Sequence, residues 1–513
     1  MGPVSAQTLP VPESTRTARL RDALLAADFT ADGCLELLGA TAYAALSRSE
    51  TVPALRATRG DGVLETLVRL FLLQRSVPRR AAAAALPLQD VVDGGWVREA
   101  ADGGVEATVD VRPYAGDEGE NWWIVSDLGC AVGGAGGIGA GTGDRDGAPD
   151  RSQLVLGVGG ASTTLAGLTV RTPVRDVLDL GTGSGVQALH AAGRASRVTA
   201  TDVNPRALRF AELTLALSGV PAADLRQGSL YEPVGEERFD LIVSNPPFVI
   251  SPGERFVYRD GGMAGDDLCR TLVGRSADHL NEGGYCQLLA NWEHVEGEDW
   301  RERVRSWLPA GCDAWIVQRE VQDPAAYAEL WLRDGGDHRT DPASYAARYD
   351  HWLAEFERRK VKGVGFGWIT VRKTGADVPS VTAEEWPHAV EQPLGPEIEQ
   401  WFAQQDFLRR HDDAALLACR FRLAEEVVQE QIGLPGTEDP EHVVLRAHRG
   451  MRRATAVDTV GAGFAGVCDG SLTAGRIVDA IAQLLGQDPV VLRDRTPASI
   501  RSLVEQGFLV PLD

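Results

Sequence analysis

Cysteine is scarce in this sequence, and the cysteines that are present lie far apart. Only seven occur in 513 residues, and no two of them form a Cys-x-x-Cys pair. An odd number of scattered cysteines argues against a disulfide framework and against a zinc site, and is typical of reduced thiols in the cytoplasm. The nine histidines show no metal-ligand spacing either. The sequence therefore predicts a cytoplasmic protein that binds no metal ion.

Long hydrophobic runs are missing as well. No apolar stretch approaches the roughly 20 residues that a membrane-spanning helix requires. Residues 1–15 lack a basic segment followed by an apolar one, so we expect no secretory signal. With 44% hydrophobic and 24% charged residues, the composition is that of a soluble globular protein without a membrane partner.

Positive charge is in short supply. The chain has 51 lysines and arginines against 73 aspartates and glutamates, which gives a formal net charge of -22. Such a surface disfavours general binding of nucleic acid, although a local basic patch can still serve that purpose. The clearest basic cluster consists of Arg446, Arg449, Arg452 and Arg453. This cluster either grips phosphate or balances an acidic surface, and we favour the second interpretation because charge runs are usually solvated.

The length of the chain predicts several domains, because 513 residues exceed one ordinary hydrophobic core. We expect an N-terminal accessory α+β domain over 1–130, a glycine-rich linker over 131–153, a central domain over 154–376 and a C-terminal helical domain over 377–513. Both terminal domains combine helices with short strands, which favours winged-helix-like folds. For the N-terminal domain, a helical cap with a β-flap fits the pattern equally well.

Within the terminal domains, the pattern of apolar residues indicates individual elements. In the N-terminal domain, residues 105–111 and 122–126 are expected to form a β-hairpin. Residues 379–393 are expected to be a linker into the C-terminal domain. Helices are then predicted at 395–410, 413–433, 474–485 and 496–506, followed by a short strand at 507–510.

The central domain alternates apolar strands with helices, which predicts an α/β fold with a doubly wound, Rossmann-like sheet. An insertion at 323–360 is expected to hold two helices between the last two strands. Seven strands are predicted, at 176–180, 197–201, 224–227, 239–244, 284–290, 314–318 and 363–371.

The turn after the first of these strands is rich in glycine. Residues 177–185 read Val-Leu-Asp-Leu-Gly-Thr-Gly-Ser-Gly and lead into a helix. The glycines at 181, 183 and 185 let the chain turn sharply and bring its backbone against a ligand at the start of that helix. A tight turn without a ligand is the alternative interpretation.

Two carboxylates accompany this turn. Asp179 lies inside the strand, where a carboxylate is rarely buried without a reason. Asp202 stands at the tip of the second strand, about 20 residues past the glycines, where an acidic side chain accepts the ribose hydroxyls of a nucleoside. Together with the glycines, they predict a nucleoside-containing ligand.

The motif Asn245-Pro246-Pro247-Phe248 directly follows the fourth strand. The side-chain oxygen of Asn245 and the carbonyl of Pro246 can accept both hydrogens of a planar NH2 group and so orient its nitrogen. The prolines fix the loop, and Phe248 can stack on a planar substrate. Alternatively, the motif is a rigid turn with a core phenylalanine.

In this order, the glycine turn, Asp179, Asp202 and the Asn-Pro-Pro-Phe motif resemble the class I S-adenosylmethionine-dependent methyltransferases. The resemblance covers about 154–374 and points to the group that includes the HemK/PrmC-type glutamine methyltransferases and the small-domain ribosomal RNA methyltransferases. A HemK-type Pro-Arg-Pro-Glu-Thr segment is absent, and Ala161-Ser162-Thr163-Thr164 stands in its place.

This resemblance implies a methyltransferase domain over 154–376 with S-adenosylmethionine as cofactor, and a role for each motif residue. Asp179 would meet the ammonium group of the cofactor, Asp202 its ribose and Ser229 its adenine, with Asn245 at the reacting end. The backbone of Gly181, Thr182, Gly183 and Gly185 would approach the cofactor closely. Asn245, Pro246 and Phe248 would act on the substrate.

The resemblance further implies transfer of a methyl group to the nitrogen of a planar NH2 group. We expect a protein glutamine amide as the acceptor, slightly ahead of an exocyclic amine of ribosomal RNA (guanine N2 or adenine N6), because the chain is acidic. The motifs also leave open a small-molecule acceptor, and a methyltransferase fold that serves only as a non-catalytic binding scaffold.

Overall fold

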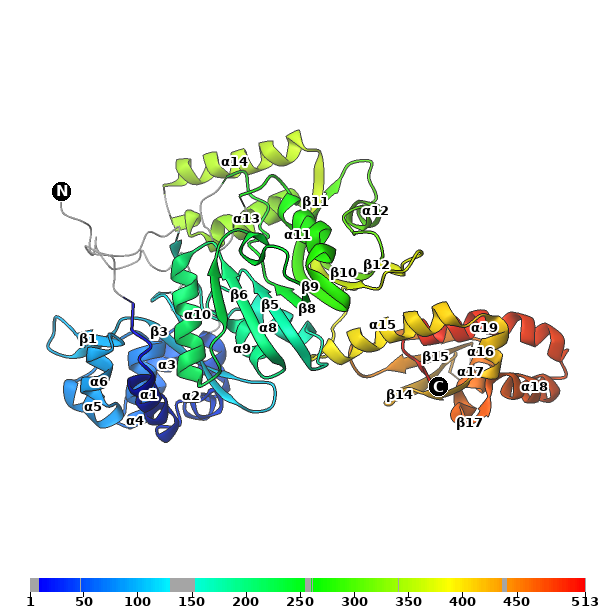
Figure 1. The fold of residues 1–513 in the computed structure, drawn as a ribbon, viewed down its shortest axis with the longest axis horizontal. Coiled ribbons are helices and arrows are strands. Elements are labelled where there is room, and N and C mark those ends of the chain that lie inside the picture. The colour runs from blue at the N-terminus through cyan, green and yellow to red at the C-terminus, as the bar shows by residue number, and fades with distance from the viewer. Residues whose placement is uncertain are drawn as a thin grey trace. The chain divides into compact units, whose positions relative to one another are not determined.

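A computed structural model describes residues 9–46, 48–129, 153–253, 260, 262–339, 341–435 and 441–512. The chain divides into two compact units (Figure 1). The first comprises Met1–Ala166 and Pro173–Trp386, and the second comprises Gly167–Thr172 and Pro387–Asp513. The predicted linker at 131–153 lies outside the described residues, except for its last position. The division of the sequence into four domains stays a prediction.

The first unit is built around an eight-stranded mixed sheet in the order β12-β10-β11-β9-β8-β5-β6-β7. Strands β5 to β9 run parallel, β11 is antiparallel to both of its neighbours, and β12 is parallel to β10. This order confirms the doubly wound α/β fold. The strands are β5 (Val174–Leu180), β6 (Ala195–Asp202), β7 (Asp224–Gln227), β8 (Phe239–Ser244), β9 (Leu280–Val295), β10 (Cys312–Gln322), β11 (Val361–Lys373) and β12 (Val381–Glu385).

All seven predicted strands are present, but the interpretation of 379–393 as a linker is wrong in part. Val381–Glu385 is β12, which pairs with β10 from Ala314 to Gln318 and forms the edge of the sheet. None of its side chains is fully buried, so the strand does not need the continuous apolar run by which the inner strands were predicted.

Outside the N-terminal region, the part of this unit that the structure describes has seven α-helices around the sheet or at its edge. They are α8 (Gly160–Leu168), α9 (Val186–Ala192), α10 (Pro205–Ser218), α11 (Asp267–Arg275), α12 (Trp300–Arg305), α13 (Pro324–Asp334) and α14 (Pro342–Arg358). The last two form the predicted insertion and contact β11 (Figure 1). No helix among the described residues is long and apolar enough to cross a membrane.

Helix α10 joins the sheet to the N-terminal region. The Asn204 side chain caps its first turn by accepting a hydrogen bond from the Arg206 N–H, and Pro205 occupies the first helical position. Its apolar face, which includes Phe210, belongs to the same buried cluster as Phe71 of the N-terminal region. The N-terminal region therefore packs directly on the central sheet's helix layer.

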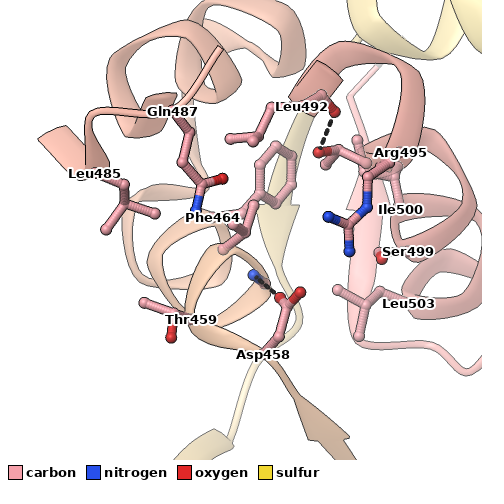
Figure 2. A pocket seen from close by; sticks show the side chains of 13 residues that line it. Asp458, Thr459, Phe464, Leu485, Gln487, Leu492, Arg495, Ser499, Ile500 and Leu503 are labelled. Atoms are coloured by element: carbon pink, nitrogen blue, oxygen red, sulfur yellow. Dashed lines mark hydrogen bonds between the residues drawn. The ribbon is translucent and has the colours of Figure 1, made fainter. Parts of the chain in front are cut away.

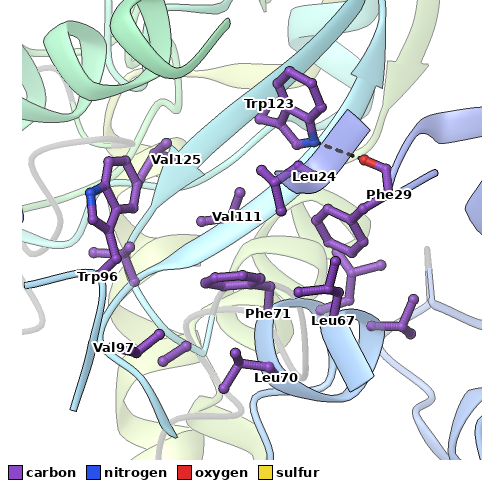
Figure 3. Packing of buried hydrophobic residues seen from close by; sticks show 14 of the residues in the cluster. Leu24, Phe29, Leu67, Leu70, Phe71, Trp96, Val97, Val111, Trp123 and Val125 are labelled. Atoms are coloured by element: carbon purple, nitrogen blue, oxygen red, sulfur yellow. Dashed lines mark hydrogen bonds between the residues drawn. The ribbon is translucent and has the colours of Figure 1, made fainter. Parts of the chain in front are cut away.

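Trp123 is central to this packing (Figure 3). It is fully buried, and its indole N–H donates to the Phe29 carbonyl at 2.8 Å. The backbone N–H groups of Trp123 and Val125 donate to Ser218 and Thr214 of α10, each at 3.0 Å. The strand that carries Trp123 is thus held by side chains of α10 instead of a further strand on that edge.

The N-terminal region contains six α-helices, one π-helix and four strands within the described residues. The predicted hairpin is only partly right: β3 pairs with β4, but β2 pairs with β1, because Thr108 donates to the Gly95 and Trp96 carbonyls and ends β2 early. The elements are α1 (Ser14–Ala26), α2 (Ala31–Leu46), α3 (Val52–Ala57), α4 (Val63–Leu67), η1 (Val68–Leu72), α5 (Arg79–Ala85), α6 (Leu88–Asp93), β1 (Val97–Glu99), β2 (Val105–Ala107), β3 (Asp110–Ala115) and β4 (Asn121–Ser126).

In its described residues, the second unit combines five α-helices with two three-stranded antiparallel sheets, β17-β13-β18 and β14-β15-β16. Its helices are α15 (Gly395–Arg410), α16 (Asp413–Ala418), α17 (Thr459–Val467), α18 (Ala474–Leu485) and α19 (Pro489–Glu505). Its strands are β13 (Arg420–Leu423), β14 (Val427–Ile432), β15 (His442–Ala447), β16 (Ala454–Val457), β17 (Asp469–Thr473) and β18 (Leu509–Pro511).

Two predicted helices of this unit need correction. The helix expected over 413–433 ends at Ala418, and the rest forms β13 and β14, whose valines and isoleucine suit strands. The helix expected from residue 496 begins at Pro489, because the Asp488 side chain accepts a hydrogen bond from the Val490 N–H and caps it there. The winged-helix-like character of both terminal regions stays a prediction.

Candidate active site

A cavity of about 700 Å3 lies at the carboxyl ends of β5, β6 and β8. The order of the sheet reverses on either side of β5, and ligands of doubly wound folds bind at such a point. Of the residues that the sequence singles out, the structure brings seven into this cavity: Gly181, Thr182, Gly183, Asp202, Ser229, Asn245 and Pro246. Asp179, Gly185 and Phe248 are not among its lining residues.

The three glycines of the turn after β5 have different roles. All three have a positive φ, of 77° at Gly181, 55° at Gly183 and 86° at Gly185. A Cβ atom at either of the first two would meet no atom within 4 Å, so their backbone faces open space. A Cβ atom at Gly185 would lie 3.0 Å from Cα of Ala211 in α10. The first two glycines therefore keep the cavity open, and the third permits α9 and α10 to pack closely.

Asp179 is buried and incompletely hydrogen-bonded. Its side chain accepts hydrogen bonds on Oδ2 from the Thr182 hydroxyl at 2.6 Å and from the Ala188 N–H at 3.0 Å. Its Oδ1 atom has no hydrogen-bond partner among the described residues. Burial raises the pKa of Asp179 to about 7, and the charge of Asp202 contributes in the same direction. A buried carboxylate oxygen without a donor suits a cationic ligand group that reaches it directly or through water.

Asp202 connects the end of β6 to the glycine turn. Its carboxylate accepts one hydrogen bond from the Gly183 N–H at 3.0 Å and another from the Asn204 N–H at 2.9 Å. Burial raises the pKa of Asp202 above its usual value. Each carboxylate oxygen keeps a second lone pair, so the side chain can still accept hydrogen bonds from hydroxyl groups of a ligand in the cavity.

Asn245 points its amide in a defined direction. Its Nδ2 atom donates to the Ser162 hydroxyl of α8 at 3.4 Å, which leaves Oδ1 as an acceptor without a partner in the described part of the chain. The following Pro246 carbonyl accepts a hydrogen bond from the Phe248 N–H at 2.8 Å, so only one of its lone pairs is left for a substrate. Ser244 donates to the Leu180 carbonyl at 2.7 Å and fixes the end of β8 beside that of β5.

Residues 159–300 match the family model described as methyltransferase small domain. This segment is a methyltransferase small domain. Two flanking segments, 26–108 and 399–511, match families described only as domains of unknown function (DUF7059 and DUF7782). The match to the methyltransferase family includes the glycine turn, both carboxylates and the Asn-Pro-Pro-Phe motif.

Curated relatives match the same methyltransferase domain. The chain is 35% identical over 122 residues to a release factor glutamine methyltransferase of Geobacter sulfurreducens, with 21% of this chain and 43% of the relative covered. It is 32% identical over 151 residues to a ribosomal protein uL3 glutamine methyltransferase of Bradyrhizobium diazoefficiens, covering 27% and 47%. It is also 34% identical over 149 residues to ribosomal RNA small subunit methyltransferase C of Salmonella arizonae, covering 29% and 37%. The chain thus spans less than half the length of each of these relatives.

In the methyltransferase domain, Phe248 lies outside the cavity. Its ring packs against two buried clusters, one of which includes Val249, Ile250 and Tyr327. The structure therefore does not bring this ring to the place where the sequence predicts stacking on a substrate. Its position instead anchors the motif to the hydrophobic core.

Sequence analysis did not predict two residues that hold the Asn-Pro-Pro-Phe segment in place. Ser162 bonds Asn245 from α8, and its own carbonyl accepts from the Gln187 side chain at 2.8 Å. Tyr327 of α13 is fully buried, and its hydroxyl accepts a hydrogen bond from the Ile250 N–H at 3.0 Å. The only available signal for Ser162 was that it replaces a family motif; nothing marked Tyr327 among the aromatic residues of the insertion.

The N-terminal region also shapes one wall of the methyltransferase cavity. Leu154, Val155 and Leu156 line it, and the buried Asp127 side chain that follows β4 accepts from the Val155 N–H at 2.9 Å. Asn204 donates to the Gln153 carbonyl at 3.0 Å from the other side. This wall segment is therefore fixed between the N-terminal region and α10. Among the described residues, no group of three or more metal-ligating side chains occurs.

Proposed function

We propose that this protein is an S-adenosylmethionine-dependent N-methyltransferase that methylates a planar NH2 group. The observation that carries the proposal is that Asn245 lines the same cavity as Gly181, Gly183 and Asp202. The residues suited to hold a nucleoside and the residue suited to orient an amide or amine thus share one space.

The residues that line the cavity, together with Asp179, which is hydrogen-bonded to the lining residue Thr182, fit the cofactor. The open backbone at Gly181 and Gly183 would receive its methionine end, and the unpaired Oδ1 of Asp179 suits its ammonium group, directly or through water. Asp202 would accept hydrogen bonds from the ribose hydroxyls. Ser229, which also lines the cavity, would form a hydrogen bond with the adenine. When bound, S-adenosylmethionine supplies an electrophilic methyl group.

Asn245 would orient the acceptor. With Nδ2 engaged by Ser162, its Oδ1 atom is free to accept one hydrogen of the NH2 group, and the remaining lone pair of Pro246 accepts the other. Both acceptors fix the direction of the nitrogen lone pair and stabilise positive charge on nitrogen as the new bond forms. The proton can leave to solvent after transfer, so the proposal requires no general base.

A protein glutamine amide is the acceptor that we favour. Relatives that match the site region are named release factor and ribosomal protein uL3 glutamine methyltransferases. The basic cluster in the second unit is also partly neutralised: Arg446 pairs with Glu430 at 2.6 Å, and Arg449 pairs with Glu426 at 2.7 Å and with Glu391 at 2.8 Å. Guanidinium groups that are held by carboxylates of the same chain are poorly available to RNA phosphates.

Ribosomal RNA is the second candidate, since another relative is named ribosomal RNA small subunit methyltransferase C. To distinguish a protein acceptor from an RNA acceptor, the enzyme is incubated with a lysate and radiolabelled methyl donor, and the labelled products are digested with protease or ribonuclease. The proposal predicts label that is lost with protease and that acid hydrolysis releases as labelled methylamine, because acid cleaves an N-methylglutamine amide to glutamate and methylamine. Label lost only with ribonuclease would identify RNA, and label in neither polymer would identify a small molecule.

None of the six cysteines among the described residues forms a disulfide bond. They support the further proposal that the protein works in the cytoplasm, where thiols stay reduced.

A further inference from the structure

The second unit contains a cavity of its own, of about 360 Å3 (Figure 2). It is formed by α17, the turn between α18 and α19, and α19 itself. Four buried apolar side chains contribute to its lining: Phe464, Leu492, Ile500 and Leu503. A cavity of this size accepts one or two side chains, and it lies at the small end of the range of ligand pockets.

Arg495 brings a guanidinium group without an ion-pair partner among the described residues to this cavity. It is exposed, lines the cavity, and directs its guanidinium group toward the side of Phe464 (Figure 2). Its side chain makes no hydrogen bond or ion pair with any residue that the structure describes. Arg493, two positions earlier on the same helix, is by contrast paired with Asp479 through Nε and Oδ1 at 2.7 Å. The charge of Arg495 is therefore available to a carboxylate from outside the unit.

The acidic residue at the same cavity is already engaged. Asp458 caps α17, and its Oδ1 atom accepts a hydrogen bond from the Gly461 N–H at 2.7 Å. It is not bonded to Arg495, so the cavity presents one engaged carboxylate and one unpaired guanidinium group. Gln487 and Ser499 add further hydrogen-bonding groups to the lining.

At the α18–α19 turn, the last residues of α18 and the first residues of α19 expose large apolar side chains. Leu484 is 85% exposed and Val490 is 72% exposed. Val491 is 50% exposed, and Leu485, which is 41% exposed, also lines the cavity. Apolar residues that cluster on a surface around a pocket are typical of protein interfaces. A nucleic-acid interface would instead be polar and strongly basic.

We propose that this cavity and the exposed α18–α19 turn form a docking site for a segment of a partner protein. In this site, an apolar side chain of the segment enters the cavity over Phe464, and an adjacent carboxylate of the segment pairs with Arg495. The exposed valines and leucines of the turn cover the flanking apolar residues of the segment. The site lies wholly within the second unit and does not depend on the methyl-transfer chemistry.

A displayed library of random 12-residue peptides, selected on the full-length protein without methyl donor, tests the site. Selected peptides are expected to share an apolar residue next to Asp or Glu. Arg495→Ala should weaken their binding at least tenfold, as should replacement of the shared acid by its amide in a synthetic peptide. Arg493→Ala is the matched control: it removes the same charge from the same helix outside the cavity and should leave binding unchanged.

A second variant, Ser499→Trp, fills the cavity from an exposed position of α19 and should abolish peptide binding. Thermal unfolding of each variant checks that the fold is intact. The site is excluded if no peptide is enriched, or if selected peptides bind both variants as tightly as the unaltered protein. A labelled 20-nucleotide RNA that binds through Arg495 in place of peptides would overturn it too. None of these outcomes bears on methyl transfer, which is measured separately.

Discussion

The Tyr327 hydroxyl accepts a hydrogen bond from the backbone N–H of Ile250 at 3.0 Å and another from the Asn291 side chain at 2.9 Å. Ile250 lies two residues after the Asn-Pro-Pro-Phe motif, whereas Tyr327 belongs to the insertion between β10 and β11. The insertion therefore holds the chain that leaves the motif, and with it the position of Asn245.

Tyr327→Phe should slow methyl transfer without weakening cofactor binding. The variant leaves the buried Ile250 N–H and the Asn291 amide without their acceptor, which should also lower the free energy of unfolding by about 1–3 kcal/mol. Steady-state kinetics should show a lower kcat, while calorimetry shows an unchanged Kd for S-adenosylmethionine. Tyr349→Phe is the control, because the hydroxyl of this tyrosine in α14 donates to the Ala325 carbonyl and not to the chain that follows the motif. Equal kcat values for the two variants would refute a positioning role for Tyr327.

The glycines of the turn after β5 should respond differently to alanine. Gly183→Ala adds a methyl group in open space, so it should cost about 1–2 kcal/mol of stability through its positive φ alone, while it obstructs the cofactor. Gly185→Ala drives a methyl group against Ala211 and should destabilise the protein more. Chemical unfolding and cofactor titration of both variants measure the two effects. The assignment fails if Gly183→Ala binds S-adenosylmethionine as tightly as the unaltered protein.

Asp179 should make the stability of the cofactor-free protein depend on pH. Burial raises its pKa in the folded protein to about 7, whereas an aspartate in an unfolded chain titrates near 3.9. Between these two values the folded state holds a proton that the unfolded state has lost. The contribution of protonated Asp179 to the free energy of unfolding is therefore complete below about pH 4 and is lost as the pH rises through about 7.

Urea unfolding of the cofactor-free protein and of Asp179→Asn, between pH 5 and pH 7.5, measures this effect. The free energy of unfolding of the unaltered protein should fall with pH relative to that of the variant, whose amide does not titrate. Parallel pH profiles would show that Asp179 stays ionised in the folded protein. Because an ammonium group favours the ionised form, calorimetry at pH 6 in buffers of different ionisation enthalpy should also detect proton release on cofactor binding.

The parts of the site that sequence analysis predicted are those formed by residues close together in the chain. The glycine turn, Asp202 and Asn245 each follow a buried parallel strand, and parallel strands bring their carboxyl ends to one edge of the sheet. The order of the strands is therefore enough to predict that these residues lie close together, even when the side-chain packing is unknown.

The contacts that escaped prediction join distant segments. Ser162 and Asn245 are 83 positions apart, and Ile250 and Tyr327 are 77 apart. Nothing in a single serine or in one tyrosine of an aromatic-rich helix specifies such a partner. Phe248 was expected at the substrate for its chemistry, whereas the structure packs its ring against two hydrophobic clusters. Likewise, β12 was missed because an edge strand needs few apolar residues.

The most direct test of the central claim is the effect of Asn245→Ala on single-turnover methyl transfer, measured together with the Kd for S-adenosylmethionine. If Asn245 orients the acceptor nitrogen, the rate constant should fall by about 10²–10³-fold, as for the loss of one transition-state hydrogen bond, with little change in Kd. Ser162→Ala, which removes only the hydroxyl that orients Asn245, should show a smaller loss of the same kind. A methyl-transfer rate for Asn245→Ala equal to that of the unaltered protein, or product methylated on oxygen or carbon, would contradict the account.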